Sequence, residues 1–130
     1  MLDIKYILDH LEEMRDIIKK RHVQADLDGL LVCYGERKDA LLALESTRAE
    51  ANKLAKTIPT AAQADKPALI EQGRALNQHI SQLEEALRLL DDAYQTALYT
   101  IPNTLPADTP LGASDEENKV LRTHLEPRVF

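Results

Sequence analysis

Apolar residues recur along the first half of the chain with the alternating spacing of four and three residues that is typical of a coiled coil. The pattern runs from Val23 to Ile58 and predicts a long helix over residues 26–57. Two arginines interrupt it, and we interpret them as polar residues that fix the register of the paired helices. The predicted seam comprises Val23, Leu27, Leu30, Tyr34, Arg37, Leu41, Leu44, Arg48, Ala51, Ala55 and Ile58.

A second seam with the same spacing follows a break that Pro59 and Pro67 bound. Pro67 suits the first turn of a helix, where its missing N–H would have had no partner, so we predict a second helix over residues 67–100. A short connection makes neighbouring helices antiparallel, which favours a two-helix hairpin over two long helices in a parallel dimer. The second seam comprises Leu69, Gly73, Leu76, Ile80, Leu83, Leu87, Leu90, Tyr94, Ala97 and Ile101.

The two ends of the chain differ from this hairpin. One stripe of apolar residues predicts an N-terminal helical segment within residues 1–22, with Asp3 as its N-cap. The basic triplet at residues 19–21 fits either the negative end of a helix dipole or a binding patch. Prolines and a glycine then predict an extended linker over residues 104–130. The N-terminal stripe comprises Ile4, Ile7, Leu8, Leu11, Met14, Ile17 and Ile18.

The predicted fold class is therefore all-α, a long antiparallel two-helix coiled-coil hairpin. Composition agrees with it, because the chain has four Tyr, one Phe and no Trp while helix-forming residues dominate. The net charge of −6 argues against a coat of nucleic acid over the whole domain. Residues 46–80, however, hold five basic and three acidic residues, a net charge of +2, so the remainder carries −8. The distal half of the hairpin is selectively basic.

Catalytic and metal-binding patterns are not found in the sequence. The histidines at positions 10, 22, 79 and 124 lack metal-ligand spacing, and neither a phosphate-binding glycine loop nor a nucleophile motif occurs. Cys33 is the single cysteine, which we interpret as a structural residue. Signal-peptide and membrane-span patterns are also missing. We expect a noncatalytic, cytoplasmic chain without cofactor, metal, DNA or membrane partner.

A family resemblance rests on the most specific stretch, residues 48–56, whose sequence RAEANKLAK is similar to the pattern R-A-E-R-N-x-L-[SA]-K. Further matches are Leu2-Asp3-Ile4-Lys5, Ala68-Leu69-Ile70, Gly73-Arg74-Ala75-Leu76, Thr100-Ile101-Pro102-Asn103, Pro110-Leu111-Gly112, Asn118, Glu126-Pro127-Arg128 and Phe130. The chain thus resembles the N-terminal arm of bacterial-type seryl-tRNA synthetase. It departs from that pattern at Ala51, where Arg is common, and at Leu125, where Gly is common.

The resemblance implies a coiled-coil arm over residues 1–103 that binds the long variable arm of serine tRNA. It places the class II catalytic domain, with its ATP, Mg²⁺ and serine sites and a homodimer interface, outside this chain. Gln72 and Gln82 supply further uncharged donors along the second helix. The candidate tRNA-binding residues are Arg48, Asn52, Lys53, Lys56, Lys66, Arg74, Asn77 and Gln78.

Two other functions remain open on the sequence. A protein-interaction coiled coil derived from the same arm would need exposed apolar residues outside the seams, and a self-contained enzyme would need a site that the sequence does not offer. The apolar candidates for an interaction surface are Leu31, Leu42, Leu54, Ile70 and Leu98.

Overall fold

The computed structural model describes residues 2–112, 114–122 and 124–125. All regular structure in these residues is helical, as predicted. In chain order the helices are α1 (Ile4–Asp9), α2 (Leu11–Lys20), α3 (Leu27–Thr57), the 3-10 turn η1 (Ile58–Thr60), α4 (Lys66–Thr100) and the 3-10 turn η2 (Asp115–Glu117).

The chain forms two compact units. One is the hairpin of residues 26–99, and the other combines the described residues of 1–25 and 100–130. The sequence-based division grouped residues 1–22 with the hairpin, whereas the structure groups both ends of the chain with each other. Within the second unit, the Arg21 guanidinium donates a hydrogen bond to the main-chain oxygen of Asn103 at 3.2 Å, which links the two ends directly.

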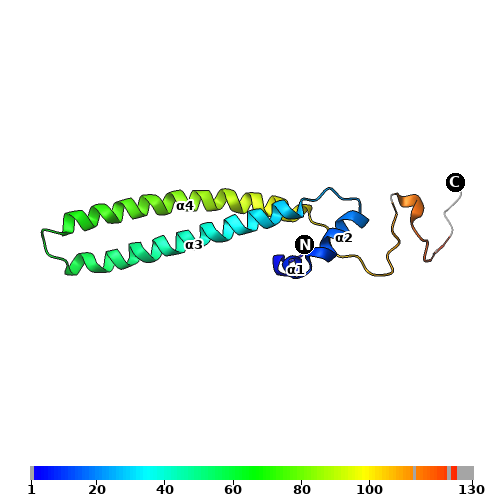
Figure 1. The fold of residues 1–130 in the computed structure, drawn as a ribbon, viewed down its shortest axis with the longest axis horizontal. Helices are drawn as coiled ribbons and strands as arrows, with labels where there is room; N and C mark the ends of the chain where they lie inside the picture. The colour runs from blue at the N-terminus through cyan, green and yellow to red at the C-terminus, as the bar shows by residue number, and fades with distance from the viewer. Residues whose placement is uncertain (1, 113, 123, 126–130) are drawn as a thin grey trace. The chain divides into compact units, whose positions relative to one another are not determined.

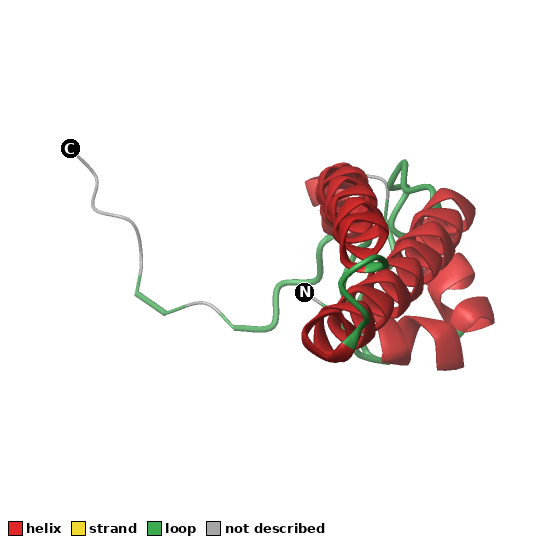
Figure 2. Ribbon diagram, turned by 90° about the vertical axis from the view of Figure 1, so that its left-hand side faces the viewer, coloured by secondary structure: helices red, strands yellow, loops and turns green. Residues whose placement is uncertain are grey.

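Helices α3 and α4 pack side by side and antiparallel, which confirms the hairpin (Figure 1). Cross-helix partners run in opposite directions along the chain: the rings of Tyr34 and Tyr94 lie 6.1 Å apart, and further along, Arg48 reaches Glu84. Figure 2 views this hairpin from its turn and shows helix and loop, with no strand, in the described residues. The two helices differ by one residue or less from the bounds that the sequence predicted.

Local sequence signals explain where the long helices begin and end. The Asp26 side chain accepts a hydrogen bond from the Gly29 amide at 2.8 Å and so caps α3. At the other end of α3, Pro59 lies within the 3-10 turn η1. Pro67 is the second residue of α4, where its lack of an N–H costs no helical hydrogen bond.

Replacing Asp26 with alanine is expected to destabilise the protein by about 1 kcal/mol, because the Gly29 amide loses its acceptor at the exposed start of α3. Urea denaturation followed by circular dichroism measures this loss. Asp26→Asn is the control, since asparagine is an equally good N-cap and should keep most of the stability. Equal destabilisation by both changes would contradict a capping role.

The predicted seam of α3 is correct from Leu27 to Leu44 and again at Ala51 and Ile58, which are half-buried, but it is wrong at the positions between them. Val23, the first predicted position, lies before α3 and is exposed. Thr47 is buried and Leu54 is half-buried, whereas Arg48 and Ala55, which the spacing had placed in the seam, are exposed. Burying the larger Leu54 removes more apolar surface from water than burying an alanine, and the guanidinium of Arg48 stays hydrated. The Thr47 hydroxyl donates to the Ala43 carbonyl at 2.8 Å, so its burial leaves no unsatisfied group. In α4, all predicted seam positions are buried or half-buried.

The N-terminal segment forms two helices where the apolar stripe predicted one. His10 separates them with φ −128° and ψ 37°. Its Nδ1 lies 2.9 Å from the Tyr6 carbonyl, the group that would accept the His10 amide in a continuous helix, and its ring stacks on Tyr6 at 4.1 Å. Asp3 caps the first helix as predicted, accepting from the Lys5 amide at 3.0 Å.

The apolar stripe is correct except at Leu8, which is exposed, since Ile7, Met14 and Ile17 are buried and its other members are half-buried. The basic triplet that follows is partly engaged within its own unit: Lys20 pairs with Asp16 at 2.7 Å, and Arg21 holds the main chain of residue 103. Two of the three cations therefore have structural partners. Among the described residues after Ile101, η2 is the one helical element, in line with the predicted extended linker.

Candidate nucleic-acid interface

The eight residues predicted to bind tRNA all lie in the distal half of the hairpin. Seven are exposed, and Lys66 is half-buried at the start of α4. Helix α3 carries Arg48, Asn52, Lys53 and Lys56, and helix α4 carries Lys66, Arg74, Asn77 and Gln78.

These residues do not form one surface, because two hollows flank the seam at Leu54 on opposite sides of the hairpin. We call the first side the lysine face; its hollow is lined by Glu50, Lys53, Leu54, Thr57, Gln72, Ala75, Leu76 and His79. We call the second side the arginine face; its hollow is lined by Ala51, Asn52, Leu54, Ala55, Ile58, Ile70, Gly73, Arg74 and Asn77. The structure thus separates Lys53 from Arg74, which the sequence had placed in one candidate site.

The cations of the distal half differ in how they are neutralised. On the arginine face, Arg74 pairs with Glu71 on the preceding turn at 3.3 Å. Arg48, four residues before Asn52 and therefore on the same side of α3, pairs across the hairpin with Glu84 at 2.6 Å. Within the described residues, Lys53 and Lys56 have no carboxylate within ion-pair distance, and both are exposed. A phosphate can therefore bind these two lysines without an existing ion pair having to break.

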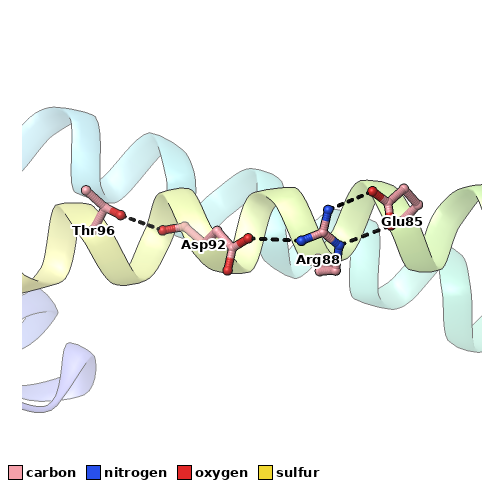
Figure 3. Close-up of polar contacts among 4 residues, drawn as sticks. All are labelled: Glu85, Arg88, Asp92 and Thr96. Carbon is pink, nitrogen blue, oxygen red and sulfur yellow. Dashed lines mark hydrogen bonds and ion pairs between the residues drawn. The ribbon is translucent and has the colours of Figure 1, made fainter.

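In the proximal half of the hairpin, Arg88 is paired within its own helix, whereas Lys38 is exposed and, like Lys53 and Lys56, has no carboxylate within ion-pair distance in the described residues. Arg88 lies between Glu85 and Asp92 on α4, with contacts of 2.8 Å and 3.4 Å, and the Thr96 hydroxyl donates to the Asp92 carbonyl (Figure 3). The hydrogen bond and charge of Arg88 lower the pKa of Glu85, and the reciprocal interaction raises the pKa of Arg88. This guanidinium is neutralised by its own helix.

Arg37, the other predicted interruption of the seam, also has its charge satisfied inside the hairpin. It forms an ion pair with Asp91 on α4, and its guanidinium lies 5.5 Å from the centre of the Tyr94 ring. Both contacts cross from α3 to α4, so Arg37 joins the two helices at one register, as the sequence suggested. Arg37 and Arg88 are therefore ion-paired within the hairpin, whereas Lys53 and Lys56 have no such partner in the described residues.

The apolar residues proposed as an interaction surface are only partly exposed. Leu98 is buried at 5%, and Leu31 and Leu54 are half-buried, so these three cover the hairpin itself. Leu42 and Ile70 are exposed, at 55% and 43%. Val32 and Leu89 were not among the apolar candidates, although their side chains are exposed at 59% and 56%. Both are apolar residues outside the two seams, and that position in the sequence could have identified them.

Other kinds of site have little support. No group of three or more His, Cys, Asp and Glu side chains in the described part of the chain is arranged to hold a metal ion. Among the described helices, none is both long and apolar enough to cross a membrane.

Comparison with known proteins shows the family of this chain. Residues 1–105 match the family described as the seryl-tRNA synthetase N-terminal domain. The serine–tRNA ligase of Deinococcus radiodurans is 35% identical over 126 residues, covering 94% of this chain and 29% of the relative. The serine–tRNA ligase of Treponema pallidum is 31% identical over 131 residues, covering 100% of this chain and 31% of the relative. The chain spans less than a third of the length of these relatives. It belongs to the seryl-tRNA synthetase N-terminal domain family.

Proposed function

We propose that the hairpin is the tRNA-binding arm of a seryl-tRNA synthetase or a seryl-tRNA synthetase-like protein. The observation that carries the proposal is the pair of exposed lysines, Lys53 and Lys56, which have no acidic partner in the described residues of an otherwise acidic chain. Family membership supports tRNA as the class of RNA, because the longer relatives are named serine–tRNA ligases.

Recognition of the long variable arm of serine tRNA would depend on shape and backbone contacts. The variable arm is double-stranded, and the deep, narrow major groove of A-form RNA does not admit side chains. Lysine ammonium groups contact phosphates, and the amides of Asn52, Asn77 and Gln78 contact phosphate or ribose oxygens without reading sequence. A pair of long helices, each roughly 50 Å in length, is suited to lie along such a duplex.

Deleting the variable arm of serine tRNA is expected to weaken binding to this chain about tenfold or more. Filter binding at two or more salt concentrations measures the effect, and affinity for the intact tRNA should fall steeply with salt because phosphate contacts release counterions. A non-cognate tRNA with a short variable arm is the control. Equal affinity for the intact and the deleted tRNA would contradict the proposal.

The chain alone is expected to show no serine-dependent pyrophosphate exchange. On the proposed function, serine, ATP and Mg²⁺ bind to a class II catalytic domain outside this chain, which also forms the homodimer interface in the cytoplasmic parent protein. Purified chain assayed beside an intact serine–tRNA ligase tests this. Exchange above background that co-purifies with the chain would overturn the noncatalytic assignment.

A protein-interaction coiled coil is the second candidate, because Val32, Leu42 and Leu89 expose apolar side chains in the proximal half of the hairpin. Singly exposed apolar residues are common on protein surfaces, and these three give no direct indication of a partner. The tRNA-binding experiment separates the two functions, since an interaction module without RNA affinity would bind neither RNA in the comparison.

A further inference from the structure

We propose that the hollow on the lysine face seats one unstacked nucleobase of the bound RNA. This inference rests on the proposed function and adds a base-binding subsite to the backbone contacts. The hollow is a wide surface groove, largely open to solvent, with a volume of about 660 Å³. Leu54, Ala75 and Leu76 supply apolar surface, and Lys53, Gln72 and His79 lie around it.

The short side chain of Ala75 keeps the apolar surface of this hollow accessible. Ala75 is exposed on α4 and lines the hollow together with Leu54 and Leu76, so a ligand can reach both leucines beside its single methyl group. Gly73, at the seam position opposite Leu54, lines the arginine-face hollow instead, and a β-carbon added to it would lie 3.8 Å from Leu54 Cδ2.

The residues around the hollow match the parts of a nucleotide. A nucleobase offers a flat apolar face, which fits the leucine and alanine surface and can stack on the imidazole of His79. The Gln72 amide has both a donor and an acceptor for a base edge, and the Glu50 carboxylate can accept from an exocyclic amino group or a 2′-hydroxyl. Lys53 supplies a cation for the adjoining phosphate.

Charge and size favour this face over the other. The arginine-face hollow is half as large, at about 330 Å³, and the guanidinium of Arg74 beside it is already paired with Glu71. No ion pair joins Glu50 and Lys53, although both line the larger hollow. The distal half as a whole carries a net positive charge, which complements RNA.

The test fills one hollow at a time with a matched substitution. Ala75→Leu places a larger side chain in the lysine-face hollow, and Ala55→Leu does the same on the arginine face. Both alanines are exposed and helical, and leucine is a good helix former, so the fold should be kept in both variants. The probes are three RNA hairpins with one stem sequence, carrying a bulged adenosine, an abasic residue at the same position, or no bulge.

The unaltered chain should bind the adenosine-bulged hairpin about tenfold more tightly than the abasic one. Ala75→Leu should abolish that preference, and Ala55→Leu should retain it. With 2-aminopurine in place of the adenosine, binding should change the fluorescence of the base in the unaltered chain and in Ala55→Leu only.

Salt-sensitive binding of all three hairpins with equal affinity would overturn the base subsite and leave the proposed function intact. Loss of the preference in both variants would overturn the assignment to the lysine face. Failure to bind serine tRNA as well as these hairpins would instead overturn the proposed function, and the base subsite with it.

Discussion

Replacing Leu30 with alanine should destabilise the protein by about 3 kcal/mol, the largest loss of stability that we expect from a single truncation in α3. The Leu30 side chain is fully buried, at 0% exposed. Shortening such a leucine removes its transfer free energy and leaves a cavity that the surrounding helices fill only partly. Urea denaturation followed by circular dichroism at a helical wavelength measures the change.

Val32→Ala is the matched control for this prediction. Val32 lies two residues along the same helix but is 59% exposed, so truncating it removes little buried surface. Alanine is also the better helix former, and the stability should change by no more than about 0.5 kcal/mol. If the two variants lose the same stability, the side chain of Leu30 does not belong to the hydrophobic core.

The long helices could be predicted from the sequence because two independent signals agree. The seam period of α4 is unbroken from Leu69 to Ile101, and prolines at 59 and 67 bound the turn. Aspartate at position 26 adds an N-cap signal at the right place. The seam period, the prolines of the turn and the N-cap residue each depend on a few neighbouring residues, so they can be recognised without knowledge of the tertiary structure.

The seam residues of α3 that lie between Leu44, Ala51 and Ile58 were not predictable from spacing alone. A strict continuation gives Arg48 and Ala55, whereas a shift of one residue gives Thr47 and Leu54, and the choice depends on which side chains gain more from burial against α4. Because Leu44, Ala51 and Ile58 stay in the seam, this exchange moves the centre of the seam by roughly 50° about the helix axis. Lys53 is therefore no longer directly opposite the seam.

The same limit explains why one candidate site became two faces. The sequence showed that the cations were outside the seam, but the side of the hairpin on which each lies depends on the phase of both helices. Ion pairing added a distinction that spacing does not contain, since Arg48 finds Glu84 only through the pairing of α3 with α4. The break at His10 likewise depends on a side chain competing for a main-chain carbonyl, which an apolar stripe does not reveal.

Two double variants with matched charge test which cations meet the RNA. Lys53→Ala with Lys56→Ala, and Arg48→Ala with Arg74→Ala, each remove two positive charges from the distal half of the hairpin. Fields between exposed charges are largely screened beyond about 8 Å at physiological ionic strength, so any difference between the variants reports local contacts. The arginines already have carboxylate partners, and exposed pairs of this kind contribute at most about 1 kcal/mol to stability.

The double lysine variant should bind serine tRNA about tenfold or more weakly, and its salt slope should fall by roughly 1 to 2, because each lost phosphate contact removes somewhat under one unit. The double arginine variant should lose less than about threefold in affinity. Alanine is the best helix former, so circular dichroism should show both hairpins intact and a loss of binding would mean lost contacts. Equal losses would show that the overall positive charge of the distal half, and not local contacts of Lys53 and Lys56, attracts the RNA. If neither variant weakens binding, the distal cations serve only solvation, and the exposed apolar residues of the proximal half become the better candidate for a binding surface.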